Sequence, residues 1–150
     1  MKTATISILF SSLLAAAPAA SDSHGFAGSW IAEGRSETRT LDITSNPDGT
    51  YLMEYKAFTG GADASRAACR ATGVLKGELL IPDAAECHGV IMTKGQEQKI
   101  DTGEEQVELD YEYVRNGDEL LEDDVICKQK GGYICTTFFT RRNPPPQTEE

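Results

Sequence analysis

The stretch Val107-Glu108-Leu109-Asp110-Tyr111-Glu112-Tyr113-Val114-Arg115-Asn116-Gly117-Asp118 contains the pattern that decides the fold. From residue 107 to 113, apolar and aromatic residues alternate strictly with acidic ones, which is typical of a β-strand with one buried face and one face in water. The Asn-Gly-Asp that follows is a strong hairpin signal, because these residues readily form the tight turn between two antiparallel strands. The stretch therefore predicts two paired strands, at 105–115 and 119–127.

The same period of two recurs along the rest of the chain. Between residues 51 and 57 the odd-numbered residues are aromatic or apolar, and the even-numbered ones include Glu54 and Lys56. Turn signals rich in Gly, Asn, Asp and Pro separate such runs. We expect the remaining strands at 28–34, 38–45, 50–58, 66–75, 78–82, 88–93 and 132–141.

Eight or nine short antiparallel strands must protect their edges from pairing with other chains. A closed up-and-down β-barrel achieves this, with alternate residues of each strand lining the interior. We therefore predict an all-β, antiparallel up-and-down barrel. A two-sheet β-sandwich is the alternative, because composition does not separate the two architectures.

The amino terminus indicates export. Lys2 precedes an apolar stretch from Ile6 to Ala17, and small residues at 17–20 offer a cleavage site. This stretch is too short to span a bilayer, which needs about 20 residues. We predict a signal peptide at 1–20, a flexible mature N-terminus at 21–25, one barrel domain at 26–142 and a disordered, Pro-rich acidic tail at 143–150. The protein is expected to be periplasmic or secreted, without a membrane span.

The net negative charge argues against two classes of binding partner, nucleic acids and anionic membranes. The chain has 14 Lys and Arg against 24 Asp and Glu, a formal charge of -10. Nucleic-acid binding relies on Lys and Arg that neutralise phosphates, so this balance argues against it. It also argues against an anionic membrane surface.

The four cysteines are expected to form two disulfides, because exported proteins meet an oxidising compartment. Of the three possible pairings we favour Cys69–Cys87 and Cys127–Cys135, since a glycine pair at 131–132 would form a hairpin turn and place Cys127 opposite Cys135. No metal site is expected, because the chain has no Cys-x-x-Cys and only two histidines.

The segment Phe26-Ala27-Gly28-Ser29-Trp30 resembles the Phe-x-Gly-x-Trp opening of the calycins, the superfamily of lipocalins, fatty-acid-binding proteins and avidins. In that family the tryptophan of the first strand packs at the closed end of the barrel, against an arginine from the last strand. The resemblance therefore assigns structural roles to Gly28, Trp30 and either Arg141 or Arg142. Such a pair gains a cation–π contact that seals the barrel floor.

Two functions are consistent with a small exported barrel. The first is to bind a small apolar or amphipathic ligand inside the barrel, with Met53, Tyr55, Leu109 and Tyr111 as walls. The pocket would then open opposite Trp30, near residues 58–62 and the segment before Cys87. The alternative is a protein-binding module, such as a hydrolase inhibitor, with a filled barrel and with loops or the acidic face as the contact. The net negative charge would steer a basic protein partner.

Catalysis has little support in the sequence. No Gly-x-Ser-x-Gly motif is present, and only His24 and His88 could serve as a histidine base. The run Glu122-Asp123-Asp124 lacks calcium-loop spacing, and we interpret it as solvated charge that blocks edge pairing. The chain is therefore expected not to be an enzyme and to need no cofactor.

Overall fold

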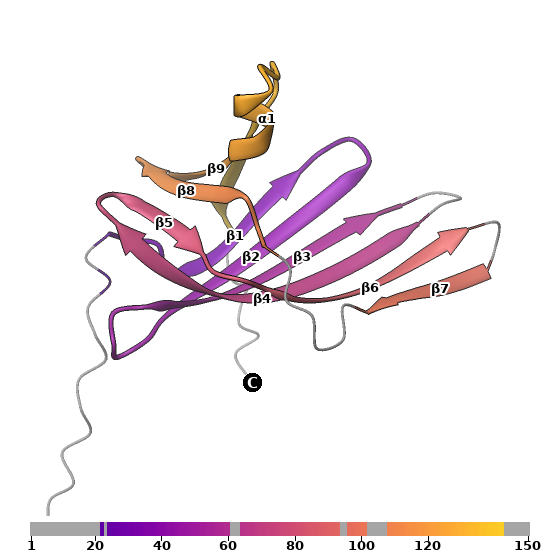
Figure 1. The fold of residues 1–150 in the computed structure, drawn as a ribbon, viewed down its shortest axis with the longest axis horizontal. Coiled ribbons are helices and arrows are strands. Elements are labelled where there is room, and N and C mark those ends of the chain that lie inside the picture. Colours follow the sequence, from indigo (N-terminus) through magenta and orange to yellow (C-terminus); the bar gives the residue numbers. More distant parts are fainter. Residues whose placement is uncertain (1–21, 23, 61–63, 94–95, 102–107, 143–150) are drawn as a thin grey trace, which may run out of the picture.

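The computed structural model of the protein describes residues 22, 24–60, 64–93, 96–101 and 108–142. Within these residues the chain forms ten antiparallel β-strands and one short α-helix (Figure 1). The strands are β1 (Gly28–Glu33), β2 (Glu37–Ser45), β3 (Tyr51–Thr59), β4 (Ser65–Lys76), β5 (Leu79–Pro82), β6 (Glu86–Thr93), β7 (Gln96–Asp101), β8 (Tyr111–Asn116), β9 (Glu119–Asp124) and β10 (Thr136–Arg141). The helix is α1 (Val125–Gln129).

The strands close into an up-and-down barrel. They follow the order β3-β2-β1-β10-β9-β8-β5-β4, and pairing of β3 with β4 completes the circle. β5 and β6 pair in succession along the same side of β4, and only β5 belongs to the closed circle. The barrel wall therefore has eight strands, and β7, which pairs with β6, lies outside it. The predicted closed antiparallel barrel is thus confirmed over the sandwich.

A bulge between β5 and β6 separates the strand that closes the barrel from the strand that leaves it. Residues 71–72 of β4 stand opposite residues 83–85, so three residues face two. The backbone amide of Asp83 still donates to the Thr72 carbonyl, at 2.8 Å. On one side of this bulge β5 pairs with β8 and closes the barrel, whereas on the other side β6 pairs with β7 and the hairpin leaves the barrel (Figure 1).

The floor of the barrel is built around Trp30, which is fully buried. The guanidinium carbons of Arg141 and Arg115 lie over its ring, 4.4 and 4.8 Å from the centroid. Arg141, through this contact with the ring, therefore takes the position that the calycin resemblance left open between Arg141 and Arg142. Gly28 permits this packing, because a Cβ there would collide with the Arg141 guanidinium. The rest of the buried core comprises Phe26, Leu41, Ile43, Tyr51, Met53, Leu80, Tyr113, Leu120 and Phe139.

Most predicted strands agree with the structure to within two residues. The turn at Gly117 is confirmed, with φ of +59° and with Asn116 in register with Glu119. Three predictions were wrong. Strand β7 was missed, residues 108–110 of the strand expected at 105–115 are not in a strand while 105–107 lie outside the described residues, and α1 with its following turn replaces the strand ends expected at 125–127 and 132–135.

Both predicted disulfides are present. Cys69 and Cys87 are in register across β4 and β6. Cys127 and Cys135 are also bonded, but Cys127 lies in α1 and not in a hairpin strand, which corrects the expected geometry. The physical reason is the N-cap: the Asp124 side chain accepts from the Cys127 amide at 2.8 Å and begins a helix there.

Some predictions fall on residues outside the described set. They are the signal peptide at 1–20, the acidic tail at 143–150, and part of the expected pocket mouth at 58–62. Within the predicted mature N-terminus, Asp22 accepts hydrogen bonds from the Tyr51 hydroxyl at 2.6 Å and from the Ala27 amide at 2.7 Å. Across the residues that the structure describes, no helix is both long enough and apolar enough to cross a bilayer.

Candidate functional site

The residues predicted to line a ligand pocket lie close together in the barrel interior. Met53, Tyr55 and Leu109 adjoin one void, together with core residues such as Leu41, and the void measures about 10 Å³. That is about the space of a single water molecule. Tyr111 is half-buried and packs against the same core. The void between these described residues is therefore far smaller than a ligand would need.

A charged cluster that the sequence analysis missed lies next to these residues. Arg39 donates from Nε and Nη2 to the two carboxylate oxygens of Glu37, at 2.9 and 3.2 Å. Its Nη1 donates to Glu122 at 3.2 Å and to the Thr137 hydroxyl at 3.4 Å. The second oxygen of Glu122 accepts from the Tyr113 hydroxyl at 2.6 Å. The cluster therefore joins β2, β8, β9 and β10 inside the barrel.

Burial controls the protonation of this cluster. Glu122 is only 2% exposed, and burial raises its pKa despite the hydrogen bonds from Tyr113 and Arg39 that lower it. Burial and the Glu122 carboxylate together raise the pKa of Tyr113 well above its usual value. Burial alone would lower the pKa of Arg39, but the Glu37 and Glu122 carboxylates outweigh it and raise the pKa. The Arg39 guanidinium thus stays charged.

Strand parity contained the signal for this cluster. Glu122 is two residues from buried Leu120 on β9, and Arg39 is two residues from buried Leu41 on β2. Residues two apart in a strand share a face, so both charges point into the barrel. The interpretation of Glu122 as a solvated residue was therefore wrong. Glu122 belongs to β9, and it lies on the same inward face of that strand as Leu120.

A groove of about 380 Å³ opens from this cluster to the outside. It is lined by Ala32 and Glu33 of β1, Gly34, Glu37 and Arg39 of the adjoining turn and β2, and Thr136, Thr137 and Phe138 of β10. The groove follows the line where β1 and β10 meet. Arg39 is 27% exposed and Glu37 35% exposed, so the cluster is accessible from this side.

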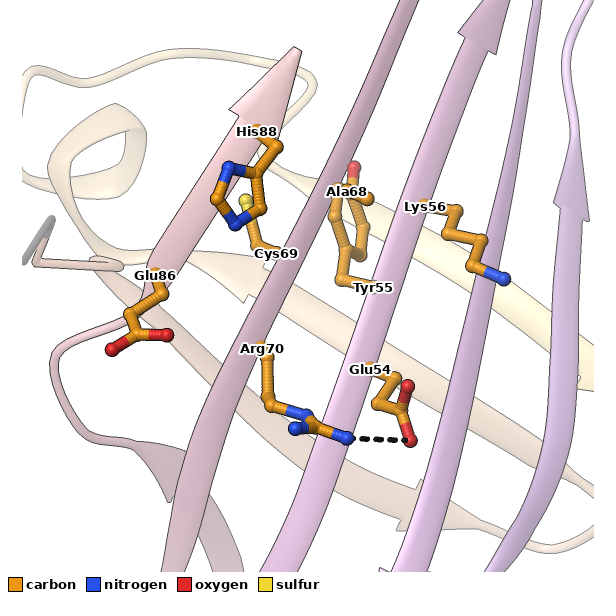
Figure 2. Close-up of a pocket in the computed structure, with 8 residues that line it drawn as sticks. All are labelled: Glu54, Tyr55, Lys56, Ala68, Cys69, Arg70, Glu86 and His88. Carbon is orange, nitrogen blue, oxygen red and sulfur yellow. Dashed lines mark ion pairs between the residues drawn. The ribbon is translucent and has the colours of Figure 1, made fainter. Parts of the chain in front are cut away.

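A second hollow, of about 230 Å³, lies on the outer face of β3, β4 and β6 (Figure 2). Figure 2 shows Lys56 and His88 on either side of the small Ala68, with Arg70 paired to Glu54 at 3.9 Å. Both members of this ion pair are well exposed, and exposed pairs contribute little stability. The hollow is lined by charged side chains of both signs around Ala68, which is typical of a solvated sheet face.

Residues 125–135, here called the finger, project from the barrel as α1 and a short loop (Figure 1). Its base is firmly held. The Cys127–Cys135 disulfide closes the loop, the Gly132 amide donates to the Cys127 carbonyl at 2.9 Å, and Lys128 pairs with Asp123 at 2.8 Å. Gly132 packs against the disulfide so closely that a Cβ would lie 2.6 Å from the Cys127 sulfur.

Two adjacent residues of the finger, just before Cys135, are apolar and exposed. Tyr133 and Ile134 have relative exposures of 103% and 91%, and Ile126 at the base is also exposed. Single exposed apolar residues are common on protein surfaces and need no explanation. Two adjacent exposed apolar residues on a loop closed by a disulfide instead indicate a binding surface. This sequence feature was not singled out as a site, because the expected hairpin would have placed these residues in a strand.

Other kinds of site find no support in the part of the chain that is described. Within it, no group of three or more His, Cys, Asp or Glu side chains is arranged to hold a metal ion. Comparison of the chain with protein-family models, with curated proteins and with solved structures finds no match.

Proposed function

We propose that this chain is an exported, lipocalin-like β-barrel that binds a protein partner through its finger, as an inhibitor of a hydrolase would. The observation that carries the proposal is the exposure of Tyr133 and Ile134 on a loop closed by the Cys127–Cys135 disulfide. An anchored loop loses little conformational entropy when it binds, so its apolar surface contributes to affinity efficiently. Tyrosine is also enriched among residues that dominate binding energy.

The small size of the void between the predicted ligand walls supports this choice over the carrier function. The predicted ligand walls around Met53 and Tyr55 adjoin a void of about 10 Å³, whereas small-molecule pockets usually measure about 300–1,000 Å³. Two disulfides support an exported protein, because such bonds persist in oxidising compartments. The Trp30–Arg141 floor supports the lipocalin-like assignment.

Site-specific photo-crosslinking tests the proposal. Benzoylphenylalanine in place of Tyr133 should give a discrete adduct with one protein in the native compartment, identified by mass spectrometry. The same probe in place of Phe58, which is exposed on β3, is the matched control and should not give that adduct. Equal adducts from both positions, or none from Tyr133, would contradict a finger contact.

Binding of the purified partner then gives the energetic test. Combined Tyr133→Ala and Ile134→Ala substitution should weaken the dissociation constant by about 30-fold or more, the effect of losing a dominant contact. Phe58→Ala should change it by less than about threefold. Because these side chains are solvent-exposed, circular dichroism and thermal melting of all variants should match those of the parent. Unchanged affinity in the finger variant would overturn the proposal.

A further inference from the structure

The two strands that close the barrel stop pairing before they end. The ladder between β1 and β10 contains two register pairs, Trp30 with Arg141 and Ile31 with Thr140. β1 nevertheless continues to Glu33, and β10 begins at Thr136. On its other side β10 pairs with β9 over five positions. We call the unpaired part of this junction, Ala32–Glu33 facing Thr136–Phe138, the seam.

Backbone groups of β10 point into the seam. The Arg142 amide donates to the Ser29 carbonyl at 2.8 Å, which fixes the side of β10 on which even-numbered residues form hydrogen bonds. Backbone direction alternates along a strand, so Phe138 and Thr136 also turn their amide and carbonyl groups toward β1. Within the described residues no strand pairs with them there. An unpaired strand edge is a template for another strand.

The groove at the seam has the charge and the apolar rim for one kind of peptide. One guanidinium, that of Arg39, pairs with Glu37 and Glu122, and Glu33 also lines the groove, so one cation stands against three carboxylates. Phe138 is 57% exposed at the outer rim. A strand that paired with β10 would direct one set of side chains outward, toward Phe138 and Glu33, and the alternate set inward, toward the side of Glu37.

We infer that the seam binds an extended, basic segment of a protein partner by β-strand addition to β10. The backbone of the segment pairs with Thr136 and Phe138, its Lys or Arg side chains point outward beside Phe138 and reach Glu33, and its alternate apolar side chains point inward beside Ala32 and Thr137. The inference extends the proposed protein-binding function to a second surface, which begins directly after the finger. The net charge of -10 favours the approach of such a basic segment.

Synthetic peptides test the seam without needing the finger's partner. Fluorescein-labelled Lys-Val-Thr-Val-Lys-Val amide should bind the purified, disulfide-bonded protein in an anisotropy titration. Replacing the central Thr by Pro removes a backbone donor and should weaken binding at least about tenfold. Replacing both Lys by Glu should weaken it further. Equal binding of the Pro peptide and the parent peptide would overturn the inference.

Protein variants and amide exchange locate the peptide. Glu33→Gln should weaken binding about threefold, whereas Glu86→Gln, the same change on the outer face of β6, should leave it unchanged. Amide hydrogen exchange should slow at Thr136 and Phe138 when the peptide is bound. Protection of 96–101 in place of 136–138 would assign the peptide to β7 and contradict the inference. Tyr133→Ala should bind the peptides normally, so a failure of the seam and a failure of the finger are distinguishable.

Discussion

Trp30 shows how a single residue connects distant parts of the chain. Its indole nitrogen donates to the Phe26 carbonyl at 2.9 Å, and Arg141 donates to the Ala27 carbonyl at 2.9 Å. Arg115 donates to the carbonyl of Gly25 on the same segment. The segment before β1 is therefore fixed by one residue from β8 and one from β10. A substitution of Trp30 should therefore remove a contact from both Arg115 and Arg141.

A double-mutant cycle tests this coupling. Trp30→Ala should lower the free energy of unfolding by about 3–5 kcal/mol, as expected for a fully buried large side chain. Arg141→Ala and Arg115→Ala should each couple to it by about 0.5–2 kcal/mol, because the residues are in contact. Exposed Arg142→Ala should be additive with Trp30→Ala and serves as the control. Additivity at Arg141 and Arg115, measured by urea unfolding, would contradict the cation–π floor.

Glu122 should leave a signature in the pH dependence of stability. Its folded-state pKa is raised above the unfolded value of 4.5, so the folded protein binds its proton more tightly. The contribution of Glu122 is therefore most favourable below pH 4.5 and decreases as the pH rises above it. The free energy of unfolding of the parent minus that of Glu122→Gln should fall as the pH rises through this window.

The contribution of Asp22 to stability should change with pH in the opposite direction, so Asp22 serves as the control. Burial raises the pKa of Asp22, but the hydrogen bonds from Tyr51 and from the Ala27, Phe26 and Gly25 amides outweigh it and lower the pKa below 3.8. Its stabilising contribution is present above pH 3.8 and is lost as the pH falls. The difference between the parent and Asp22→Asn should thus rise with pH at the acidic end. The same slope in both comparisons would refute the burial argument for Glu122.

At the scale of elements, the finger depends on glycine for two different reasons. Gly131 has φ of +72° and open space where a Cβ would stand, whereas a Cβ on Gly132 would lie 2.6 and 2.9 Å from the two sulfurs. Gly131→Ala should therefore cost about 1 kcal/mol through backbone strain alone. The disulfide should form normally in that variant.

Gly132→Ala should instead oppose the closed form of the finger. We expect overpacking of about 1–3 kcal/mol and a measurable fraction of protein with free Cys127 and Cys135 thiols after refolding. Alkylation followed by mass spectrometry counts these thiols. If Gly132→Ala oxidises as completely as Gly131→Ala, the close packing of Gly132 on the disulfide does not constrain the finger.

The elements also show what sequence patterns can and cannot predict. Alternation predicted β3 well, since one face of this strand meets the core. The pattern failed at β7, where the sequence Gln96-Glu97-Gln98-Lys99 is polar on both faces and the strand lies outside the barrel. It failed at α1 because a single N-cap hydrogen bond and a disulfide, both local details, override a short apolar run.

The candidate site was less predictable than the fold for a related reason. Met53, Tyr55 and Leu109 adjoin one void, and strand parity explains why Met53 and Tyr55 share a face of β3, whereas Leu109 lies before β8. Whether the barrel interior contains a cavity depends on the sizes of all inward side chains and on how the strands close the barrel. A local sequence pattern predicts neither. The early end of the β1–β10 ladder likewise arises from the global arrangement of strands, so the seam has no sequence signature.

For the molecule as a whole, the central question is whether the interior admits a ligand. With a filled core, Met53→Trp should overpack the barrel and lower the free energy of unfolding by about 1–3 kcal/mol. Phe58→Trp, on the same strand but facing outward, should be nearly neutral. A fluorescent fatty acid should show no saturable binding to the parent. Saturable binding that Met53→Trp abolishes without loss of stability would favour a carrier.

The pairing of β1 with β10 has a consequence for how the protein is made. The first and last described strands of the domain are neighbours, so the contacts that close the barrel join residues at opposite ends of the sequence. Such high contact order makes folding slow and prevents a nascent chain from completing its structure while β10 is still inside the ribosome. Until then Trp30 lacks Arg141 and β1 lacks one neighbour. The barrel therefore closes only after β10 has left the ribosome, and the wall between β1 and β10 is the last part of the sheet to form.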